Sequence, residues 1–383
     1  MTQLDRMGFP IPDDARELRE MMLRFGAEEC APGAAERDRT HAFPAKQIDA
    51  LARLGAMAMK TPEEDFGPGV SNLGYALAIE ALARHDASIC VVTVASNLAG
   101  AILAQQCTSE QKRRYLHPAA KGEFGALSFA LTEPGAGSDA ANIKTTARRT
   151  AAGWSLTGTK QWITGASNAK LFLVFARIPD EGDRAIGCFA VEAGTPGFSL
   201  GRIEDKMGLT SSGTAMLHFD GVEIPEHALI GAPGAGLKVA LSAIAPSRVA
   251  IAAESIGIAE RAFELGRDYA RERQAFGQPL AGFQNTRFIL ADARTQLDQA
   301  WLLMLRAATM LDQGVPIRAE ASMAKLAASE TCGRVVDAML QLHGGNGYAR
   351  DYEIERLYRD ARVMRIFEGT SEVQRDVIAR DIL

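Results

Sequence analysis

The chain has 383 residues, of which 47% are hydrophobic and 23% are charged, and this composition excludes a disordered regulator, a fibre and a collagen-like repeat. Its length is too great for one small core and predicts two or three domains. The net charge is −5, with 42 basic and 47 acidic residues and no basic stripe, so the sequence does not predict a nucleic-acid binder.

The cysteines and histidines are too scattered to predict a metal site or a disulfide framework. The five cysteines include no CxxC pair, and the six histidines stand apart without an HExxH motif. Residues 1–10 lack the apolar stretch of a secretory signal and the Arg- and Ser-rich character of a transit peptide. We therefore expect no metal and a reducing, cytoplasmic location of bacterial type.

One uncharged segment, residues 87–107, is long enough to raise the question of a membrane span. Ser88, Thr93 and Asn97 interrupt it, and most of its apolar residues are Ala and Val. A helix buried inside a helical domain has the same pattern, so we interpret the segment as a core helix and expect no membrane insertion.

The first part of the chain, residues 1–122, has the apolar spacing of an α-helical domain. Asp13 and Asp14 precede an apolar stripe, and we expect them to cap a helix. Thr108 and Gln111 have the spacing of a capping box, which predicts a second helix start.

Residues 123–235 change to short runs of β-branched and aromatic residues separated by glycine, which predicts a β domain. Residues 145–150 and 154–157 flank a turn and predict a hairpin. Short strands at regular spacing are typical of a small barrel or sandwich. Further strands are predicted at 171–176, 187–190 and 214–219.

Residues 236–383 return to a helical period and predict a C-terminal four-helix bundle. The predicted fold is therefore an α+β multidomain chain in the order helical domain, β domain, helical bundle. The helices of the bundle are predicted at 258–272, 286–313, 318–342 and 354–366.

The segment LTEPGAGSD at residues 131–139 is polar and rich in glycine. Its glycines let backbone N–H groups approach an anion, and Thr132 and Ser138 add hydroxyl donors. A long β-turn also explains the segment and is favoured when the segment is taken alone. Gly135 and Gly137 resemble part of a dinucleotide fingerprint, but no βαβ unit follows, so a Rossmann site is not predicted.

Two further segments have residues suited to a flat cofactor and to proton transfer. In KQWITG, residues 160–165, Trp162 and Thr164 suit an aromatic plate with a hydroxyl at a ring edge, or an ordinary packed surface pair. In RIFEGTSE, residues 365–372, Glu368 lies between a helix and a break. A glutamate there is normally solvated, but a buried one is a base with a raised pKa.

Five motifs occur in an order that closely resembles the acyl-CoA dehydrogenase family of flavoproteins. They are TEPGAGSD at 132–139, KQWITG at 160–165, RQAFG at 273–277, HGGNGY at 343–348 and FEGTSEVQR at 367–375. The resemblance covers nearly the whole chain, including its helical–β–helical order.

The resemblance implies FAD held between the β domain and the C-terminal bundle. It also implies a homo-oligomer, commonly a dimer of dimers, because part of each FAD site comes from a neighbouring subunit. The FAD residues implied within one subunit are Phe129, Leu131, Thr132, Gly137, Ser138, Trp162, Ile163, Thr164, Thr370 and Glu372. Those implied from the neighbour are Arg273, Phe276, Gln284, Gln341, Gly344 and Gly345.

Glu368 matches the catalytic base of the family. The implied reaction removes the α proton of an acyl-CoA at Glu368 while a hydride leaves the β carbon for flavin N5, which yields a trans-2-enoyl-CoA. Electrons then pass to electron-transfer flavoprotein. One branch of the family places its base immediately before an arginine that matches Arg248, but Ser247 stands there in this chain. The implied substrate contacts are Ser138, Arg248, Gly369 and Arg375.

Four other residues bear on the implied substrate site. Glu254 is interpreted as a structural or solvated glutamate. Ala245 replaces the aspartate that the family often has there, and Thr210 and Gly213 stand where an arginine and an aspartate are common, near the expected CoA or acyl entrance.

The acyl pocket is expected to use the helix around residues 90–98, including Thr93. Arg84 and His85 precede this helix. Turned inward they would select an anionic acyl group, but a solvated helix end is favoured.

Four alternatives to an acyl-CoA dehydrogenase stay open from the sequence, one of which is a helical membrane-associated protein. A flavin acyl-CoA oxidase on the same fold would pass electrons to oxygen. A non-catalytic flavin- or CoA-binding protein would not need Glu368. A nitroalkane-oxidase-like enzyme is disfavoured because a related base there is aspartate.

Overall fold

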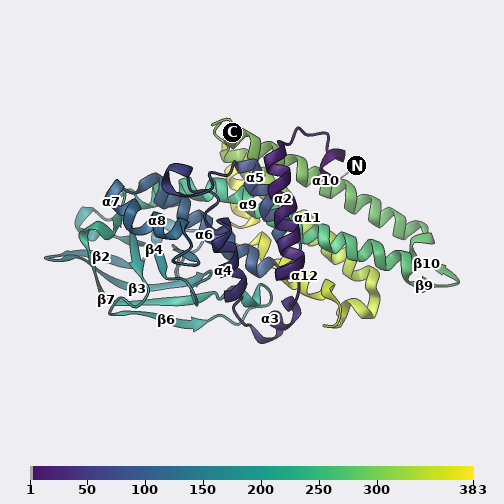
Figure 1. Ribbon diagram of the computed structural model, residues 1–383, viewed down its shortest axis with the longest axis horizontal. Helices are drawn as coiled ribbons and strands as arrows, with labels where there is room; N and C mark the ends of the chain where they lie inside the picture. The colour runs from purple at the N-terminus through teal and green to yellow at the C-terminus, as the bar shows by residue number, and fades with distance from the viewer. Residues whose placement is uncertain (1–2) are drawn as a thin grey trace.

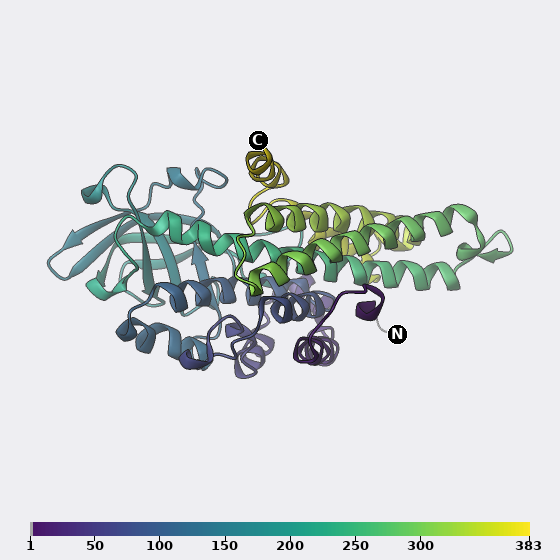
Figure 2. The same ribbon diagram turned by 90° about the horizontal axis from the view of Figure 1, so that it is seen from above.

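The computed structural model describes residues 3–383 and arranges the chain along one long axis. A β-sheet lies at one end, long helices extend to the other end, and shorter N-terminal helices pack against both (Figures 1 and 2). The predicted order of helical, β and helical regions is confirmed.

The N-terminal region contains eight helices, of which α5 and α6 are buried on nearly every side. The predicted capping box is confirmed, since the Gln111 N–H donates to Thr108 Oγ1 at 3.3 Å and the Thr108 N–H to Gln111 Oε1 at 2.8 Å. The predicted capping by Asp13 and Asp14 is wrong: both lie in the first turn of α2, after Pro12. The helices are α1 (Gln3–Arg6), α2 (Asp13–Phe25), α3 (Ala34–Thr40), α4 (Ala45–Arg53), α5 (Asn72–Ala83), α6 (Ala87–Gln106), α7 (Ser109–Gln111) and α8 (His117–Ala120).

Two helices in residues 3–383, α6 and α9, are long and apolar enough to cross a membrane by length and composition. In α6, 83% of the apolar window is buried inside the protein, and in α9 72% is buried. The interpretation of residues 87–107 as a core helix therefore agrees with the burial of α6.

Eight strands form one sheet in the order β6-β7-β3-β2-β4-β5-β8, and β1 pairs in parallel with β4. The predicted hairpin is confirmed, with β2 antiparallel to β3 and Thr150 opposite Gly153. Strands β1, β6 and β8 were not predicted, because β1 and β8 are short and β6 has no buried alternate face. The strands are β1 (Leu127–Ala130), β2 (Thr146–Thr150), β3 (Gly153–Ile163), β4 (Leu171–Arg177), β5 (Ile186–Glu192), β6 (Phe198–Ile203), β7 (Ala215–Pro225) and β8 (Leu229–Ile230).

Strand β4 is buried on both faces of the sheet, which explains its continuous apolar sequence. Leu171, Leu173 and Phe175 join the cluster formed with α6 and the start of α9. Phe172 and Val174 point to the opposite face and join the core between neighbouring strands. The sheet is thereby fixed against the helices that carry the rest of the site.

The C-terminal helices are α9 (Gly236–Glu272), α10 (Gln284–Asp312), α11 (Arg318–His343), α12 (Glu353–Ala361) and α13 (Ser371–Ile382). Helix α9 begins at Gly236 rather than at residue 258, since Pro246 within it concealed the helical pattern. The short hairpin of β9 (Gln274–Ala275) and β10 (Gln278–Pro279) lies at the tip of the bundle, at the far end from the sheet (Figures 1 and 2).

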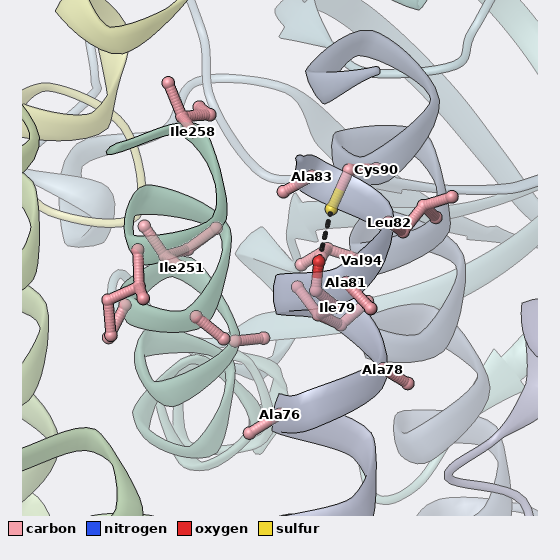
Figure 3. Packing of buried hydrophobic residues seen from close by; sticks show 14 of the residues in the cluster. Ala76, Ala78, Ile79, Ala81, Leu82, Ala83, Cys90, Val94, Ile251 and Ile258 are labelled. Atoms are coloured by element: carbon pink, nitrogen blue, oxygen red, sulfur yellow. Dashed lines mark hydrogen bonds between the residues drawn. The ribbon is translucent and has the colours of Figure 1, made fainter. Parts of the chain in front are cut away.

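Helices α5, α6 and α9 form the centre of the helical core. Figure 3 shows Ile251 and Ile258 of α9 across from small and branched side chains of α5 and α6, and the Cys90 Sγ–H donating to the Ile79 carbonyl. A Cβ on Gly257 would lie 2.3 Å from the Glu80 carbonyl oxygen, so α9 rests directly on α5 at this point.

Candidate active site

Glu368 lies in the short segment between the 3-10 turn Arg362–Arg365 and helix α13. Its φ is +54° and that of Gly369 is +89°, so the chain reverses sharply here. Gly369 has to be glycine, because a Cβ would also lie 2.7 Å from Gln374 Nε2. A strained non-glycine residue of this kind is typical of functional sites.

Two buried side chains hold the backbone of this segment. Lys325 on α11 donates to the Gly369 carbonyl oxygen at 2.9 Å. Gln374 on α13 donates to the same oxygen at 2.8 Å and to the Glu368 carbonyl oxygen at 3.2 Å. Both side chains are fully buried, so the position of Glu368 is fixed from two helices.

Glu368 is half-buried, but its Oε2 is buried and has no hydrogen-bond partner among residues 3–383. Burial raises the pKa of Glu368 to about 7, although the positive charges of Arg248 and Lys325 act to lower it. Burial also lowers the pKa of Lys325 to about 8. A freely solvated glutamate does not account for the buried Oε2, and a pKa of about 7 lets the carboxyl act as a base near neutral pH.

Arg248 on α9 brings a second cation to the segment. Its Nη1 donates to Ser322 Oγ on α11 at 3.1 Å, and a Cβ on Gly369 would lie 3.7 Å from Nη2. Burial lowers the pKa of Arg248, and the charge of Glu368 opposes that effect. Ser247, next to it, has a buried Oγ without a partner among the described residues.

The glycine-rich loop of residues 131–139 and the tryptophan-containing segment 160–165 are adjacent in the structure. Lys160 Nζ donates to the Leu131 carbonyl oxygen at 3.0 Å and to Glu133 Oε1 at 2.7 Å, and the Gln161 N–H donates to the Thr132 carbonyl oxygen at 2.9 Å. Lys160 is completely buried. This ion pair fixes the loop of residues 131–139 beside Trp162.

Trp162 is presented to the outside by an irregularity in β3. The register between β3 and β7 shifts between Lys160 and Ile163, and Trp162 has a φ of +62°. Its side chain is 53% exposed, so the ring offers an open face. A packed surface pair does not account for such an arrangement, whereas a flat ligand against the ring does.

Three glycines of the motifs indicate whether this site has room for FAD. A Cβ on Gly135, Gly137 or Gly345 would meet no heavy atom within 4 Å, and none of the three has a positive φ. Neither packing nor backbone conformation of this chain therefore requires glycine there. A ligand that approaches the backbone closely does require it, so these residues fit a phosphate-bearing cofactor.

The other residues implied within one subunit differ in what their side chains can reach. Leu131 and Ile163 are buried in the core, which leaves only their backbones for a cofactor. Thr370 caps α13 by accepting from the Val373 N–H at 3.3 Å. Phe129, Thr132 and Thr164 are half-buried, while Gly137, Ser138 and Glu372 are exposed.

The residues implied from a neighbouring subunit are exposed and lie apart from Thr132 and Trp162. Phe276 in the β9–β10 hairpin is 97% exposed and has a φ of +51°. In Figures 1 and 2 this hairpin and the sheet are at opposite ends of the molecule. One chain therefore does not bring the two sets together. The exposed residues are Arg273, Phe276, Gln284, Gln341, Gly344 and Gly345.

The implied substrate contacts are also only partly assembled in one chain. Ser138 is exposed, while Arg248 and Gly369 lie together beside Glu368. Arg375 is exposed on α13, with an Nη 3.9 Å from Glu330 Oε1 on α11.

The structure shows what Thr210, Gly213 and Arg84 contact, and it overturns the expectation of a solvated helix end at Arg84. Thr210 is buried and donates to Asp38 Oδ1 at 2.9 Å, so its hydroxyl holds α3 and is not offered to a ligand. A Cβ on Gly213 would lie 2.1 Å from Ser167 Oγ, so that residue also serves packing. Arg84 is neither solvated nor free to bind an acyl group, because it is buried and paired with Glu80 and Glu264.

Three functional candidates were not found by sequence reasoning. Lys325 and Gln374 support the Glu368 segment; the sequence signal of Lys325 is a polar residue on the buried side of a helix, while Gln374 lies within the motif at 367–375 but was given no role. Glu254 was interpreted as structural or solvated, and the solvated alternative is wrong since it is 0% exposed. Burial and the nearby charges of Asp360 and Glu368 raise the pKa of Glu254 well above its ordinary value.

The solved structures to which the chain is similar include butyryl-CoA dehydrogenase from Megasphaera elsdenii, with a TM-score of 0.94 and 35% identity over 98% of this chain and 99% of that chain. The solved structure of PigA with FAD and proline is also similar, with a TM-score of 0.93 and 28% identity over 98% of both chains. The chain is also 42% identical over 376 residues to the mitochondrial short-chain specific acyl-CoA dehydrogenase of Bos taurus, covering 97% of this chain and 91% of that protein.

Family models match three consecutive parts of the chain. The N-terminal domain of acyl-CoA dehydrogenase matches residues 12–123, the middle domain matches 128–222, and the C-terminal domain matches 234–383. Together they cover most of the chain in the order of the observed helical, β and helical regions. The chain belongs to the acyl-CoA dehydrogenase family.

Proposed function

We propose that this enzyme dehydrogenates short acyl-CoA thioesters to trans-2-enoyl-CoA, with Glu368 as the base that removes the α proton. The observation that carries the proposal is the buried Oε2 of Glu368, which has no hydrogen-bond partner in the part of the chain that the structure describes, on a backbone segment held by Lys325 and Gln374. A carboxyl kept unbonded in a confined site is available to a substrate atom.

The α proton of a thioester is weakly acidic, so its removal requires a base that is ionised and shielded from water. With a pKa raised to about 7, Glu368 is substantially ionised at neutral pH and still basic enough to accept the proton. Arg248 and Lys325 stabilise the carboxylate before the transfer. After it, the neutral acid no longer interacts with either charge.

FAD, when bound, supplies the acceptor for the hydride that leaves the β carbon. One proton and one hydride leave the acyl chain, and a carbon–carbon double bond forms between the α and β carbons. Trp162 and the loop of residues 131–139 would hold the cofactor in one subunit. Phe276 and the residues around Gly344 would complete its site from another subunit in a dimer of dimers.

The names of the similar proteins support a short acyl chain, since one is a short-chain specific enzyme and another acts on butyryl-CoA. We propose that Ser138, Arg248, Gly369 and Arg375 contact the thioester or its CoA. Electron-transfer flavoprotein is the proposed acceptor of the electrons, and a cytoplasmic location is proposed with it.

The test is an anaerobic titration of the purified holoenzyme with acetyl-, butyryl-, hexanoyl- and octanoyl-CoA, followed by flavin absorbance. Bleaching by butyryl- or hexanoyl-CoA, with a trans-2-enoyl-CoA as product, supports the proposal. A flavin that no thioester bleaches would support a non-catalytic protein instead. Oxygen uptake at the full turnover rate, without electron-transfer flavoprotein, would identify an oxidase.

A further inference from the structure

Glu254 on α9 is a completely buried carboxyl group that this chain does not pair. Its side chain is 0% exposed, and neither Oε1 nor Oε2 has a hydrogen-bond partner among residues 3–383. Leaving such a group unbonded is destabilising, because its lost hydration is not replaced. A buried polar group of this kind is expected to be retained for a partner that the protein alone does not supply.

The position of Glu254 along α9 relates it to the active site. It follows Ser247 by seven residues, which places both on the same side of the helix, about 10 Å apart along its axis. Ser247 precedes Arg248, whose guanidinium lies beside Gly369. Both Ser247 Oγ and the Glu254 carboxyl are buried and have no hydrogen-bond partner within the described part of the chain. On this side of α9, Ser247 lies near the Glu368 segment and Glu254 lies further along the helix, towards the core.

The far end of this side is closed. Gly257 comes just after Glu254, and there α9 rests on the Glu80 carbonyl of α5 without room for a Cβ. Ile251 and Ile258, which flank Glu254 on α9, lie across from the apolar side chains of α5 and α6 (Figure 3). The surroundings of Glu254 are thus mostly apolar.

The charges around Glu254 favour its neutral form. Glu368 and Asp360 are close enough to repel a negative charge on it, and burial acts in the same direction. Burial raises the pKa of the Tyr75 phenol, and the negative charges of Glu254 and Glu368 raise it further, so both glutamates lie near this residue. A neutral carboxyl has one O–H donor and a free acceptor oxygen, which complement a hydroxyl group.

We propose that Glu254 forms the inner end of the acyl site and hydrogen-bonds a hydroxyl group at the end of a short acyl chain. This inference rests on the proposed function and names its substrate class as hydroxyacyl-CoA thioesters. Because Glu368 is close enough for its charge to act on Glu254, a short acyl chain with its α carbon at Glu368 would extend towards Glu254. The hydroxyl takes no part in the reaction, because the α proton goes to Glu368 and the β hydride to FAD, as for an unsubstituted chain.

The test compares two thioesters of equal chain length, 5-hydroxypentanoyl-CoA and hexanoyl-CoA, in which a hydroxyl replaces a methyl group. Binding is measured by calorimetry in holoenzyme carrying Glu368→Gln, which prevents turnover. We expect the hydroxyacyl thioester to bind about tenfold more tightly. In holoenzyme that also carries Glu254→Leu, we expect hexanoyl-CoA to bind more tightly than the hydroxyacyl thioester. With Glu254→Gln instead, most of the preference for the hydroxyacyl thioester should remain, because an amide also donates and accepts hydrogen bonds.

Glu264→Gln is the matched control on the same helix, since Glu264 faces Arg84, and it should leave the preference unchanged. A preference for hexanoyl-CoA in the parent, unaltered by either change at Glu254, overturns the inference. If the leucine variant does not fold, Glu254→Ala makes the same comparison, because it also removes the hydrogen-bonding group and should abolish the preference for the hydroxyacyl thioester.

The failure of this inference is distinguishable from failure of the proposed function. Bleaching of the wild-type flavin by both thioesters, without a hydroxyl preference in binding, supports dehydrogenation and overturns the role of Glu254. A hydroxyl preference in binding without bleaching by any thioester supports the role of Glu254 and overturns the dehydrogenase proposal.

Discussion

Lys325 Nζ donates a 2.9 Å hydrogen bond to the carbonyl oxygen of Gly369, the residue that follows Glu368. This bond brings a positive charge next to the proposed base without a direct ion pair between the two side chains. Glu368 therefore keeps its carboxyl free for the substrate, while its ionised form is stabilised from α11. The arrangement leads directly to a prediction about pH.

For the wild-type enzyme we expect kcat/KM for butyryl-CoA to rise with pH through about 7 and then level off. The raised pKa of Glu368 means that the neutral acid, which cannot accept a proton, predominates below this value. Replacing Lys325 by Met removes a charge that lowers this pKa, so the rise should shift to higher pH by roughly one unit. The measurement is the pH profile of kcat/KM.

Lys60→Met is the matched control for Lys325→Met. Lys60 also donates to a backbone carbonyl, that of Val70, at 3.1 Å, but it does not act on the pKa of Glu368. We expect its pH profile to match that of the wild type. A uniform loss of activity in Lys325→Met, with the midpoint of the rise unmoved, would indicate a purely structural lysine.

Replacing Glu368 by Gln keeps the size of the side chain but removes the base. We expect the rate of flavin bleaching by butyryl-CoA to fall by about 10²- to 10⁴-fold, with the flavin still bound, because general base catalysis contributes about this much. Stopped-flow absorbance under anaerobic conditions measures it. Glu20→Gln, an exposed change on α2, should bleach at the wild-type rate. Unchanged bleaching in Glu368→Gln would remove Glu368 from the mechanism.

The sequence predicts the order of the three regions because periodicity and glycine content are local properties. Helix α9 was predicted too short because Pro246 breaks the local pattern, although tertiary packing carries the helix through it. Local patterns also cannot show that the Lys160 ammonium meets Glu133, which lies 27 residues earlier in the chain. For the same reason, Lys325 could not be connected to Gly369, which lies 44 residues later, before folding placed α11 beside the Glu368 segment.

Burial of Glu254 leads to a prediction about stability. Its folded pKa is raised well above the value in the unfolded chain, so the folded state holds the proton over a wider range of pH. The contribution of Glu254 to stability is therefore present at acidic pH and is lost as pH rises towards its folded pKa, by up to 1.4 kcal/mol per pH unit. Glu254→Gln should lose this pH dependence.

The measurement is Tm between pH 5 and pH 9 at fixed protein concentration and saturating FAD. We expect the Tm of the wild type to fall relative to that of Glu254→Gln as pH rises, because only the wild type has to hold or lose this proton. Glu20→Gln should run parallel to the wild type. Parallel curves for Glu254→Gln and the wild type would show that Glu254 titrates as in the unfolded chain.

The exposed ring of Phe276 leads to a prediction about assembly. It is 97% exposed at the tip of the bundle and held at a φ of +51°, which is unusual for a bulky side chain. If a second subunit buries the ring next to FAD, Phe276→Ser should weaken the dimer about 10- to 100-fold, since burying a phenylalanine contributes about 1.5–3 kcal/mol. Mass photometry measures the oligomer, and the absorbance ratio of flavin to protein measures retained FAD.

Phe66→Ser provides a close comparison for Phe276→Ser. Phe66 is 59% exposed with a φ of +65°, but it packs on His117 of its own chain rather than at the bundle tip. We expect this variant to keep both the oligomer and its FAD. Both phenylalanines are exposed and have a positive φ, so Phe66→Ser controls for the loss of an exposed ring from a strained backbone position. Full FAD retention and an unchanged oligomer in Phe276→Ser would therefore contradict a shared cofactor site at the hairpin.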